Sequence, residues 1–236
     1  MIRGVTVDVL LNPEGYGAKS AASWLTGHGV HVRYALDALW AKEASHLGTI
    51  VRYADDAVIL CRCGADAQHA YRWLQGRAQA LKLALHPDKT PIVDLNAGTG
   101  GFDFLGFHLR LVKSRRYGRW YCQRWPSGRA MASIRAKVKT ITALRSRLKQ
   151  PIRVLVAELN PVLRGWGNYF RWGNSSRKFS QIDTYVHERL ALFDSKKRQR
   201  SGRRWGEVHN SSWATNLGVH RLTGTIRHGQ PAIAST

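Results

Sequence analysis

The hydrophobic positions of the first half of the chain follow a strand pattern around one polar turn. At residues 51–60, apolar and β-branched residues flank the adjacent acids Asp55 and Asp56, which predicts a strand, a tight turn and a second strand. Over residues 64–83, apolar residues recur every three or four positions, as they do on one face of a helix. We therefore expect a β-hairpin followed by a helix.

The neighbouring segments extend this pattern into a sheet. Residues 34–40 have helical apolar spacing, and residues 90–95 predict a short strand. Residues 102–109 alternate large apolar residues like one hairpin strand, and a basic hairpin is expected to turn near residues 117–118. Together these elements predict an α+β fold for the first half, with an antiparallel sheet and at least one long helix.

The first thirty residues show little regular spacing of apolar residues. Residues 5–11 have the composition of a strand, whereas residues 12–29 are rich in Gly, Ala and Ser. We expect residues 1–30 to be loop, or a start that does not belong to the fold. Acidic residues become rare in the second half of the chain. We therefore divide the rest of the chain into three segments, residues 31–128, 129–195 and 196–236.

From Arg129 onward, the spacing of the apolar residues becomes that of helices. One apolar stripe has spacings of three and four and consists of Met131, Ile134, Val138, Ile141, Leu144 and Leu148. A second helix is expected over residues 152–159, and Asn160 followed by Pro161 predicts the start of a third. Ser175 or Ser176 is expected to cap a fourth helix. Its predicted inner face consists of Phe179, Ile182, Val186, Leu190 and Phe193. The tail is expected to be irregular or short-stranded.

The charge is strongly positive and unevenly distributed. Thirty-seven Lys and Arg stand against fifteen Asp and Glu, which gives a net charge of +22. Residues 104–157 contain fourteen Lys and Arg and no acid. Such an excess indicates a polyanionic partner, most often nucleic acid. An anionic membrane surface is the rival partner, but here the cations are interleaved with aromatics, and no apolar run approaches the roughly 18 residues of a membrane span.

The predicted helices carry basic residues on their outer faces. On the first of them these are Arg135, Lys137, Lys139, Arg145 and Lys149. A solvated surface helix is the alternative, but without acids to form pairs along the helix these cations repel one another, and a phosphate backbone would relieve that repulsion. The other candidate RNA contacts are Arg164, Asn168 and Arg171, and the loop residues Lys196, Lys197 and Arg198.

The paired acids and the cysteines are the other candidate sites. Two neighbouring carboxylates repel each other unless a cation relieves them, and Mg²⁺ is bound through such oxygens. Asp55 and Asp56 therefore predict a metal-binding hairpin tip. The three cysteines, at 61, 63 and 122, are odd in number, and we expect reduced thiols. Zinc binding at Cys61 and Cys63 is the alternative to buried small residues.

Four segments carry a resemblance to a known family. They are Tyr-Ala-Asp-Asp at 53–56, Leu-His-Pro-Asp-Lys-Thr at 85–90, Phe-Leu-Gly-Phe at 104–107 and Leu-Asn-Pro-Val-Leu-Arg-Gly-Trp-Gly-Asn-Tyr-Phe at 159–170. The first three together resemble the back half of the palm of a reverse transcriptase. The fourth resembles the maturase-specific (thumb, or X) domain of group II intron-encoded proteins. The resemblance covers roughly residues 31–228.

The resemblance implies an RNA-directed DNA polymerase that also binds its intron RNA for splicing and retrohoming. Asp55 and Asp56 match the family's metal-binding turn, and Lys89 matches a lysine that protonates the leaving pyrophosphate. Phe104, Leu105 and Gly106 match the segment that holds the primer end. The implied cofactor is Mg²⁺, and the implied partners are intron RNA and the template–primer. Residues 130–193 would be the thumb.

The chain departs from the family before the acidic turn. The family's fingers, its first catalytic Asp and its Pro-Gln-Gly segment should precede residue 53 and are not found there. Asp8 is the one candidate for the missing acid, and a chance strand acid is the favoured interpretation. We therefore expect a truncated or frameshifted, cytoplasmic fragment that binds RNA and is weak or inactive in DNA synthesis alone. The alternatives are an active polymerase, whole or complemented by a separate piece, a non-catalytic splicing factor, and a basic RNA-binding protein unrelated to introns. No C-terminal endonuclease is expected.

Overall fold

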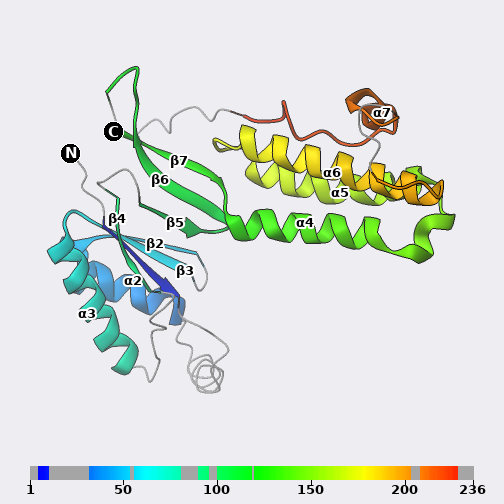
Figure 1. The fold of residues 1–236 in the computed structure, drawn as a ribbon. Coiled ribbons are helices and arrows are strands. Elements are labelled where there is room, and N and C mark those ends of the chain that lie inside the picture. Colours follow the sequence, from blue (N-terminus) through cyan, green and yellow to red (C-terminus); the bar gives the residue numbers. More distant parts are fainter. Residues whose placement is uncertain are drawn as a thin grey trace. The chain divides into compact units, whose positions relative to one another are not determined.

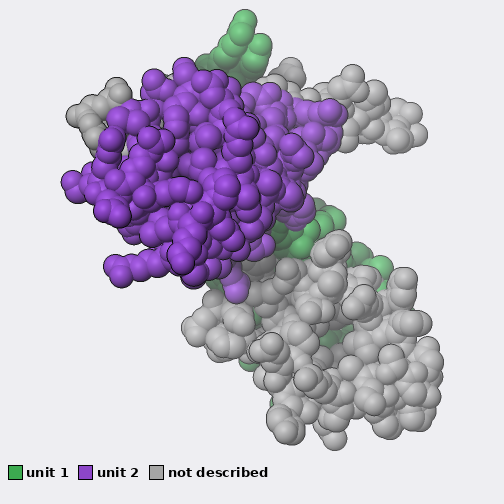
Figure 2. Space-filling view, turned by 90° about the vertical axis from the view of Figure 1, so that its right-hand side faces the viewer, with its two compact units in different colours: residues 1–105, 109–122 green, residues 106–108, 123–236 purple. Residues whose placement is uncertain are grey.

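The computed structural model consists of two compact units (Figures 1 and 2). It describes residues 5–10, 32–53, 56–80, 90–95, 100–118, 120–202 and 208–227. Unit 1 comprises residues 1–105 and 109–122, and unit 2 comprises residues 106–108 and 123–236. The chain combines small antiparallel sheets with several helices, in agreement with the expected mixture of helix and antiparallel sheet. Among the described residues, no helix has the length and apolarity that crossing a membrane requires.

Unit 1 contains a four-stranded antiparallel sheet in the order β2-β3-β1-β4. Its strands are β1 (Val5–Leu10), β2 (Gly48–Tyr53), β3 (Asp56–Cys61) and β4 (Ile92–Asp94). The hairpin predicted around the paired acids is confirmed as β2 and β3, whose register pairs Tyr53 with Asp56.

The expectation that residues 1–30 stand outside the fold is wrong for β1. This strand lies inside the sheet, between β3 and β4, and pairs with both. Its alternation of Val with polar residues fits such a position, whereas the Gly-rich residues after it obscured the pattern. The expectation for residues 11–31 lies outside the described residues.

Two helices and the sheet form the core of unit 1. The helices are α2 (Val32–Glu43) and α3 (Gly64–Ala80), and the 3₁₀ helix η1 (Ser45–Leu47) follows α2. Both helices were expected at these places. Ala67, Ala70 and Leu74 of α3 are buried, together with Trp40 of α2 and Ile59 of β3. Glu43 at the end of α2 links the helices, since it accepts hydrogen bonds from Trp73 and Arg77 of α3.

A second antiparallel sheet, in the order β5-β6-β7, contributes residues to both units. Its strands are β5 (Gly101–Phe104), β6 (Phe107–Lys113) and β7 (Trp120–Pro126). The prediction of one strand over residues 102–109 is wrong, because Leu105 and Gly106 turn the chain. Both have positive φ, 49° and 76°, as in the tightest hairpin turns. The predicted basic hairpin is confirmed as β6 and β7.

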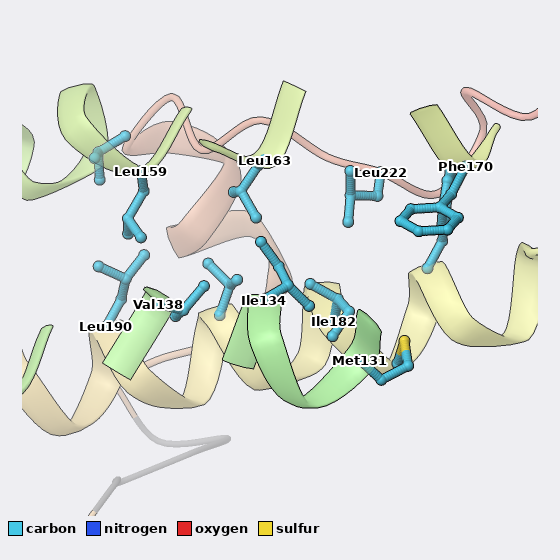
Figure 3. Close-up of a cluster of buried hydrophobic side chains, with 12 residues drawn as sticks. Met131, Ile134, Val138, Leu159, Leu163, Phe170, Ile182, Leu190 and Leu222 are labelled. Atoms are coloured by element: carbon cyan, nitrogen blue, oxygen red, sulfur yellow. The ribbon is translucent and has the colours of Figure 1, made fainter. Parts of the chain in front are cut away.

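Unit 2 is a three-helix bundle with a C-terminal segment. Its helices are α4 (Gly128–Ala143), η3 (Arg145–Lys149), α5 (Ile152–Phe170), α6 (Ser176–Lys197) and α7 (Ser211–Asn216). Figure 3 shows the core between the three long helices, where Ile134, Leu163 and Ile182 are almost fully buried. The five residues predicted for the inner face of the fourth helix are all buried in α6.

Two helix boundaries in unit 2 differ from the predictions. The apolar stripe beginning at Met131 does not continue past Ala143, and Leu144 is 49% exposed. The predicted second and third helices are one helix, α5, which passes through Pro161. Proline has no backbone N–H, so the carbonyl of Ala157 lacks its helical hydrogen-bond donor. Ala157 is exposed, and water can replace that donor.

The C-terminal segment (residues 208–227) is bonded to α5 and α6. Asn160 of α5 donates to the carbonyl of Gly218 at 2.9 Å and accepts from the amide of His220 at 2.7 Å. Asp183 of α6 accepts the amides of Leu222 and Thr223, each at 2.9 Å. This segment includes α7, whereas the sequence predicted an irregular or short-stranded tail.

Candidate nucleic-acid interface

The three long helices of unit 2 meet along three grooves, and one of them is covered. The C-terminal segment covers the groove between α5 and α6, where Leu222 is fully buried. A Cβ atom on Gly167 of α5 would lie 2.6 Å from Leu222 Cδ2. Asp183 also accepts the Thr223 hydroxyl at 2.6 Å. The described residues leave hollows along the other two grooves, on either side of α4.

The groove between α4 and α5 is hereafter the α4–α5 groove. It has a volume of about 460 Å³. Its lining combines a cation, aromatics and small residues: Ala130, Ser133, Ile134, Lys137, Pro161, Val162, Gly165, Trp166, Tyr169 and Phe170. Small residues let a ligand backbone approach the helices closely, and exposed aromatic rings are surfaces on which bases and sugars stack.

The aromatic residues of this groove differ in burial. Their spacing of three and four is that of core residues, and Phe170 is buried, whereas Trp166 is half-buried and Tyr169 is exposed. Tyr169 is 51% exposed, because it lies at the edge of the helix face that Phe170 buries. The indole nitrogen of Trp166 is buried without an acceptor among the described residues. A buried donor of this kind destabilises the fold unless an acceptor reaches it.

The acids of unit 2 do little to neutralise its surface. Asp183 and Asp194 are buried. Asp194 accepts from His209 at 3.0 Å and pairs with Arg198 at 2.9 Å. Glu158 pairs with Arg147 at 2.5 Å. Asp183, Asp194 and Glu158 are thus held in internal bonds, and the lysines and arginines of the described helices far outnumber the carboxylates. The electrostatic field outside this unit therefore favours anions.

One known family resembles part of this unit. Residues 131–210 match the family model of the group II intron, maturase-specific domain. The matched segment supports a group II intron maturase and indicates a function in splicing. No curated protein matches the chain.

The maturase-specific segment contains the basic residues predicted to bind nucleic acid, and the structure divides them among different surfaces. Lys137 lines the α4–α5 groove. Arg135 lies on the opposite flank of α4, with its guanidinium 6.0 Å from the ring centroid of Tyr185. Lys139 and Arg145 are exposed and line neither groove.

The polar residues predicted on α5 lie away from the α4–α5 groove. Arg164 and Asn168 are exposed, on the flank of α5 that faces the C-terminal segment. The carbonyl of Arg171 accepts from the amide of Arg227 at 2.9 Å. Its guanidinium lies 5.3 Å from the Trp172 ring, and its Nε atom is buried without an acceptor among the described residues.

Two of the predicted loop residues have partners within the maturase-specific segment. Lys197 Nζ donates to the carbonyl of Gln150 at 2.6 Å, and Arg198 pairs with Asp194. Lys196 is exposed in the last turn of α6. Lys197 and Arg198 therefore hold the end of α6 in place. To contact RNA, either side chain would have to bind it in addition to its present partner.

The sequence did not single out the α4–α5 groove. The available signal was the set of small residues at its edges, Ala130 and Ser133 on α4 and Gly165 on α5. Small residues recur at such spacings on many helices, so they indicate a close approach only after the helix pairing is known.

The acidic turn of unit 1 is described in part. Asp56 begins β3, but its side chain, Asp55 and Lys89 lie outside the described residues. The backbone register places Asp8 of β1 opposite Val58, two residue pairs from the pair of Leu10 and Asp56. The sheet thus places the strand of Asp8 directly beside β3.

The predicted primer-holding residues form the turn between β5 and β6. Phe104 ends β5, and Leu105 and Gly106 are the two turn residues with positive φ. Such a backbone is strained for a leucine, by roughly 1–2 kcal/mol. Within unit 2, the carbonyl of Gly106 accepts from the amide of Ser127 at 2.8 Å. This bond holds the turn against the start of α4.

The cysteines are free thiols. Cys61 is buried, and Cys63 and Cys122 are exposed, so the interpretation as buried small residues is right for Cys61 and wrong for Cys63. Burial, with Asp66 and Cys63 nearby, raises the pKa of the Cys61 thiol to about 11. In the described part of the chain, no three His, Cys, Asp or Glu residues lie together in a way that would hold a metal ion.

Proposed function

We propose that this chain binds group II intron RNA through unit 2 and promotes splicing of that RNA. The observation that carries the proposal is the match of residues 131–210 to the maturase-specific domain. The charge supports it, because the lysines and arginines of the described helices of unit 2 far outnumber its acids, and Asp183, Asp194 and Glu158 are engaged in internal bonds.

The α4–α5 groove is the proposed contact. Lys137 supplies a positive charge for a phosphate, and Tyr169 supplies an exposed ring on which a base or ribose packs. Ser133 and Gly165 leave room for the RNA backbone between the two helices. The indole N–H of Trp166, at the base of the groove, is a further donor once RNA oxygen displaces its neighbours.

The test compares binding of a group II intron RNA to the full chain and to variants. Lys137→Gln with Tyr169→Ala should weaken binding about tenfold to a hundredfold and lower the dependence of affinity on salt. Arg153→Gln is the control, since Arg153 is exposed in the first turn of α5 and lines neither groove. The proposed function is wrong if the unaltered chain binds this RNA no better than a shuffled RNA and does not promote splicing.

DNA synthesis is the second candidate function, favoured by the position of β1. The sheet order β2-β3-β1-β4 places the strand of Asp8 next to the strand that Asp56 begins. Asp55 and Asp56 would hold Mg²⁺, with Asp8 as the candidate for a third carboxylate; such metals activate a primer hydroxyl and stabilise the leaving oxygen. Lys89 would protonate the leaving group, and Phe104, Leu105 and Gly106 would position the primer end.

Primer extension tests this second candidate. We expect weak or no DNA synthesis by the chain alone with Mg²⁺ and dNTPs, because residues 1–52 contain no Pro-Gln-Gly segment. Robust synthesis that Asp55→Ala and Asp8→Asn each abolish, with RNA binding retained, would establish an active polymerase. Splicing that survives Asp55→Ala would assign the RNA function to unit 2 without the acidic turn.

A further inference from the structure

The second open groove of unit 2 lies between α4 and α6, and we propose that it binds the phosphate backbone of a second RNA segment. This inference rests on the proposed RNA function and adds a second RNA-binding face. The groove has a volume of about 600 Å³. Its lining residues are Arg135, Arg177, Ser180, Gln181, Thr184, Tyr185 and Glu188. We call it the α4–α6 groove.

Two arginines supply its positive charge. Arg135 is half-buried on α4, and its guanidinium lies over the Tyr185 ring of α6. Packing against the ring restricts the side chain, so less entropy is lost when it binds a phosphate. Arg177 is exposed at the start of α6. The two guanidinium groups outweigh the one carboxylate of the lining, that of Glu188.

The start of α6 is unusually basic for a helix N-terminus. Its first turn carries Arg177 and Lys178 and no acid, although the positive end of a helix dipole disfavours cations. Ser175 does not cap the helix with its side chain, because its hydroxyl donates to the carbonyl of Phe170 at 2.8 Å. An anion in the groove would relieve this repulsion.

Neutral hydrogen-bonding groups complete the groove. Ser180, Gln181 and Thr184 lie at successive turns of α6 on the same flank as Arg177. Hydroxyl and amide groups next to arginines are the common partners of phosphate and ribose oxygens, and they carry no information about base sequence. The groove thus fits an RNA backbone better than an apolar peptide segment.

The two open grooves face different sides of the bundle. Arg135 and Lys137 are two residues apart on α4, which places them about 200° apart around the helix axis. Each lines a different groove. One RNA duplex therefore cannot lie in both without bending around α4, and the bundle is suited to hold two RNA segments together.

The experiment titrates the full chain with a short RNA duplex and records affinity, salt dependence and stoichiometry. Arg135→Gln with Arg177→Gln should remove about two units from the slope of log Kd against log salt concentration and abolish binding of the second duplex. The Lys137→Gln, Tyr169→Ala variant should retain one duplex. The control removes two exposed charges that line neither groove, Arg153→Gln with Arg200→Gln, and circular dichroism checks that every variant is folded.

The outcomes separate this inference from the proposed function. If the unaltered chain binds a single duplex, or the arginine variant behaves as the control does, the α4–α6 groove is not an RNA-binding face, although the RNA function stands. If the unaltered chain binds no RNA at all, the proposed function fails and the inference fails with it. Loss of the second duplex in the arginine variant alone would establish the second face.

Discussion

Single buried carboxylates hold the C-terminal segment of unit 2 in place. Asp183 is only 8% exposed and accepts two backbone amides and one hydroxyl from Leu222 and Thr223. Asp194 has a similar role toward His209. The few acids of a very basic region are therefore structural, because a buried carboxylate is tolerated only when hydrogen bonds replace its water.

Replacing Asp183 by Asn should destabilise unit 2 by about 2–4 kcal/mol. The amide nitrogen of Asn would face a backbone amide that donates, so at least one bond is lost and one buried donor is left unpaired. Urea unfolding measures the change. Glu158→Gln is the control, since the pair of Glu158 with Arg147 is exposed and its loss should cost at most about 1 kcal/mol. Equal effects of the two variants would contradict the structural role of Asp183.

At the scale of elements, α5 is the helix on which the bundle depends. One flank, with Val162, Trp166 and Tyr169, faces the α4–α5 groove, and the flank with Asn160 and Gly167 meets the C-terminal segment. Two glycines of this helix, only two residues apart, therefore have opposite surroundings. A Cβ on Gly165 would meet nothing within 4 Å, whereas one on Gly167 would lie 2.6 Å from Leu222 Cδ2.

These surroundings predict opposite effects of the same substitution. Gly165→Ala should stabilise unit 2 by about 0.5–1 kcal/mol, because alanine is the better helix former. Gly167→Ala should destabilise it despite the same gain, because the methyl group displaces the fully buried Leu222. Thermal unfolding of both variants measures the difference. A similar gain in both would mean that the C-terminal segment does not pack closely on α5.

For the molecule as a whole, the protonation of two partly buried histidines links the stability of unit 2 to pH. Burial lowers the pKa of His187, with Asp183 raising it and Arg221 lowering it again. Burial also lowers the pKa of His220, followed by repulsion from Arg164, while Asp183 opposes both. Both imidazoles therefore favour the neutral form in the folded unit.

Unit 2 should therefore lose stability as the pH falls. In the unfolded chain both histidines take up a proton near pH 6.5, whereas the folded unit does so only at lower pH. Proton uptake then favours unfolding, so the free energy of unfolding decreases as the pH falls through 6.5 toward the folded pKa values. Unfolding curves between pH 8 and 5 measure this, with His187→Gln, His220→Gln as the comparison. A double variant with an unchanged pH dependence would exclude these residues as the cause.

Much of the fold followed from local patterns. The hairpin around Asp56, the helix α3 and the buried face of α6 can be predicted from the spacing of hydrophobic residues. An element that buries one face places its hydrophobic residues at the repeat of a strand or of a helix. Local patterns misled where a residue bonds far away in the sequence. Asn160 and Pro161 resemble a helix start, but the Asn160 side chain bonds Gly218 and His220 instead. Leu105 and Gly106 resembled the middle of a strand, because apolar alternation carries no signal of positive φ.

Charge and hydrophobic spacing are properties of the residues, so the chain's basic helical half with the maturase-specific pattern can be predicted without a structure. Which flank of the bundle each cation occupies depends on how the helices pack. Lys137 and Arg135 are two residues apart and line different grooves. The third groove is closed by a segment that lies about sixty residues beyond Asn160 in the chain. Such long-range contacts depend on how the helices pair, and no local pattern of residues specifies that pairing.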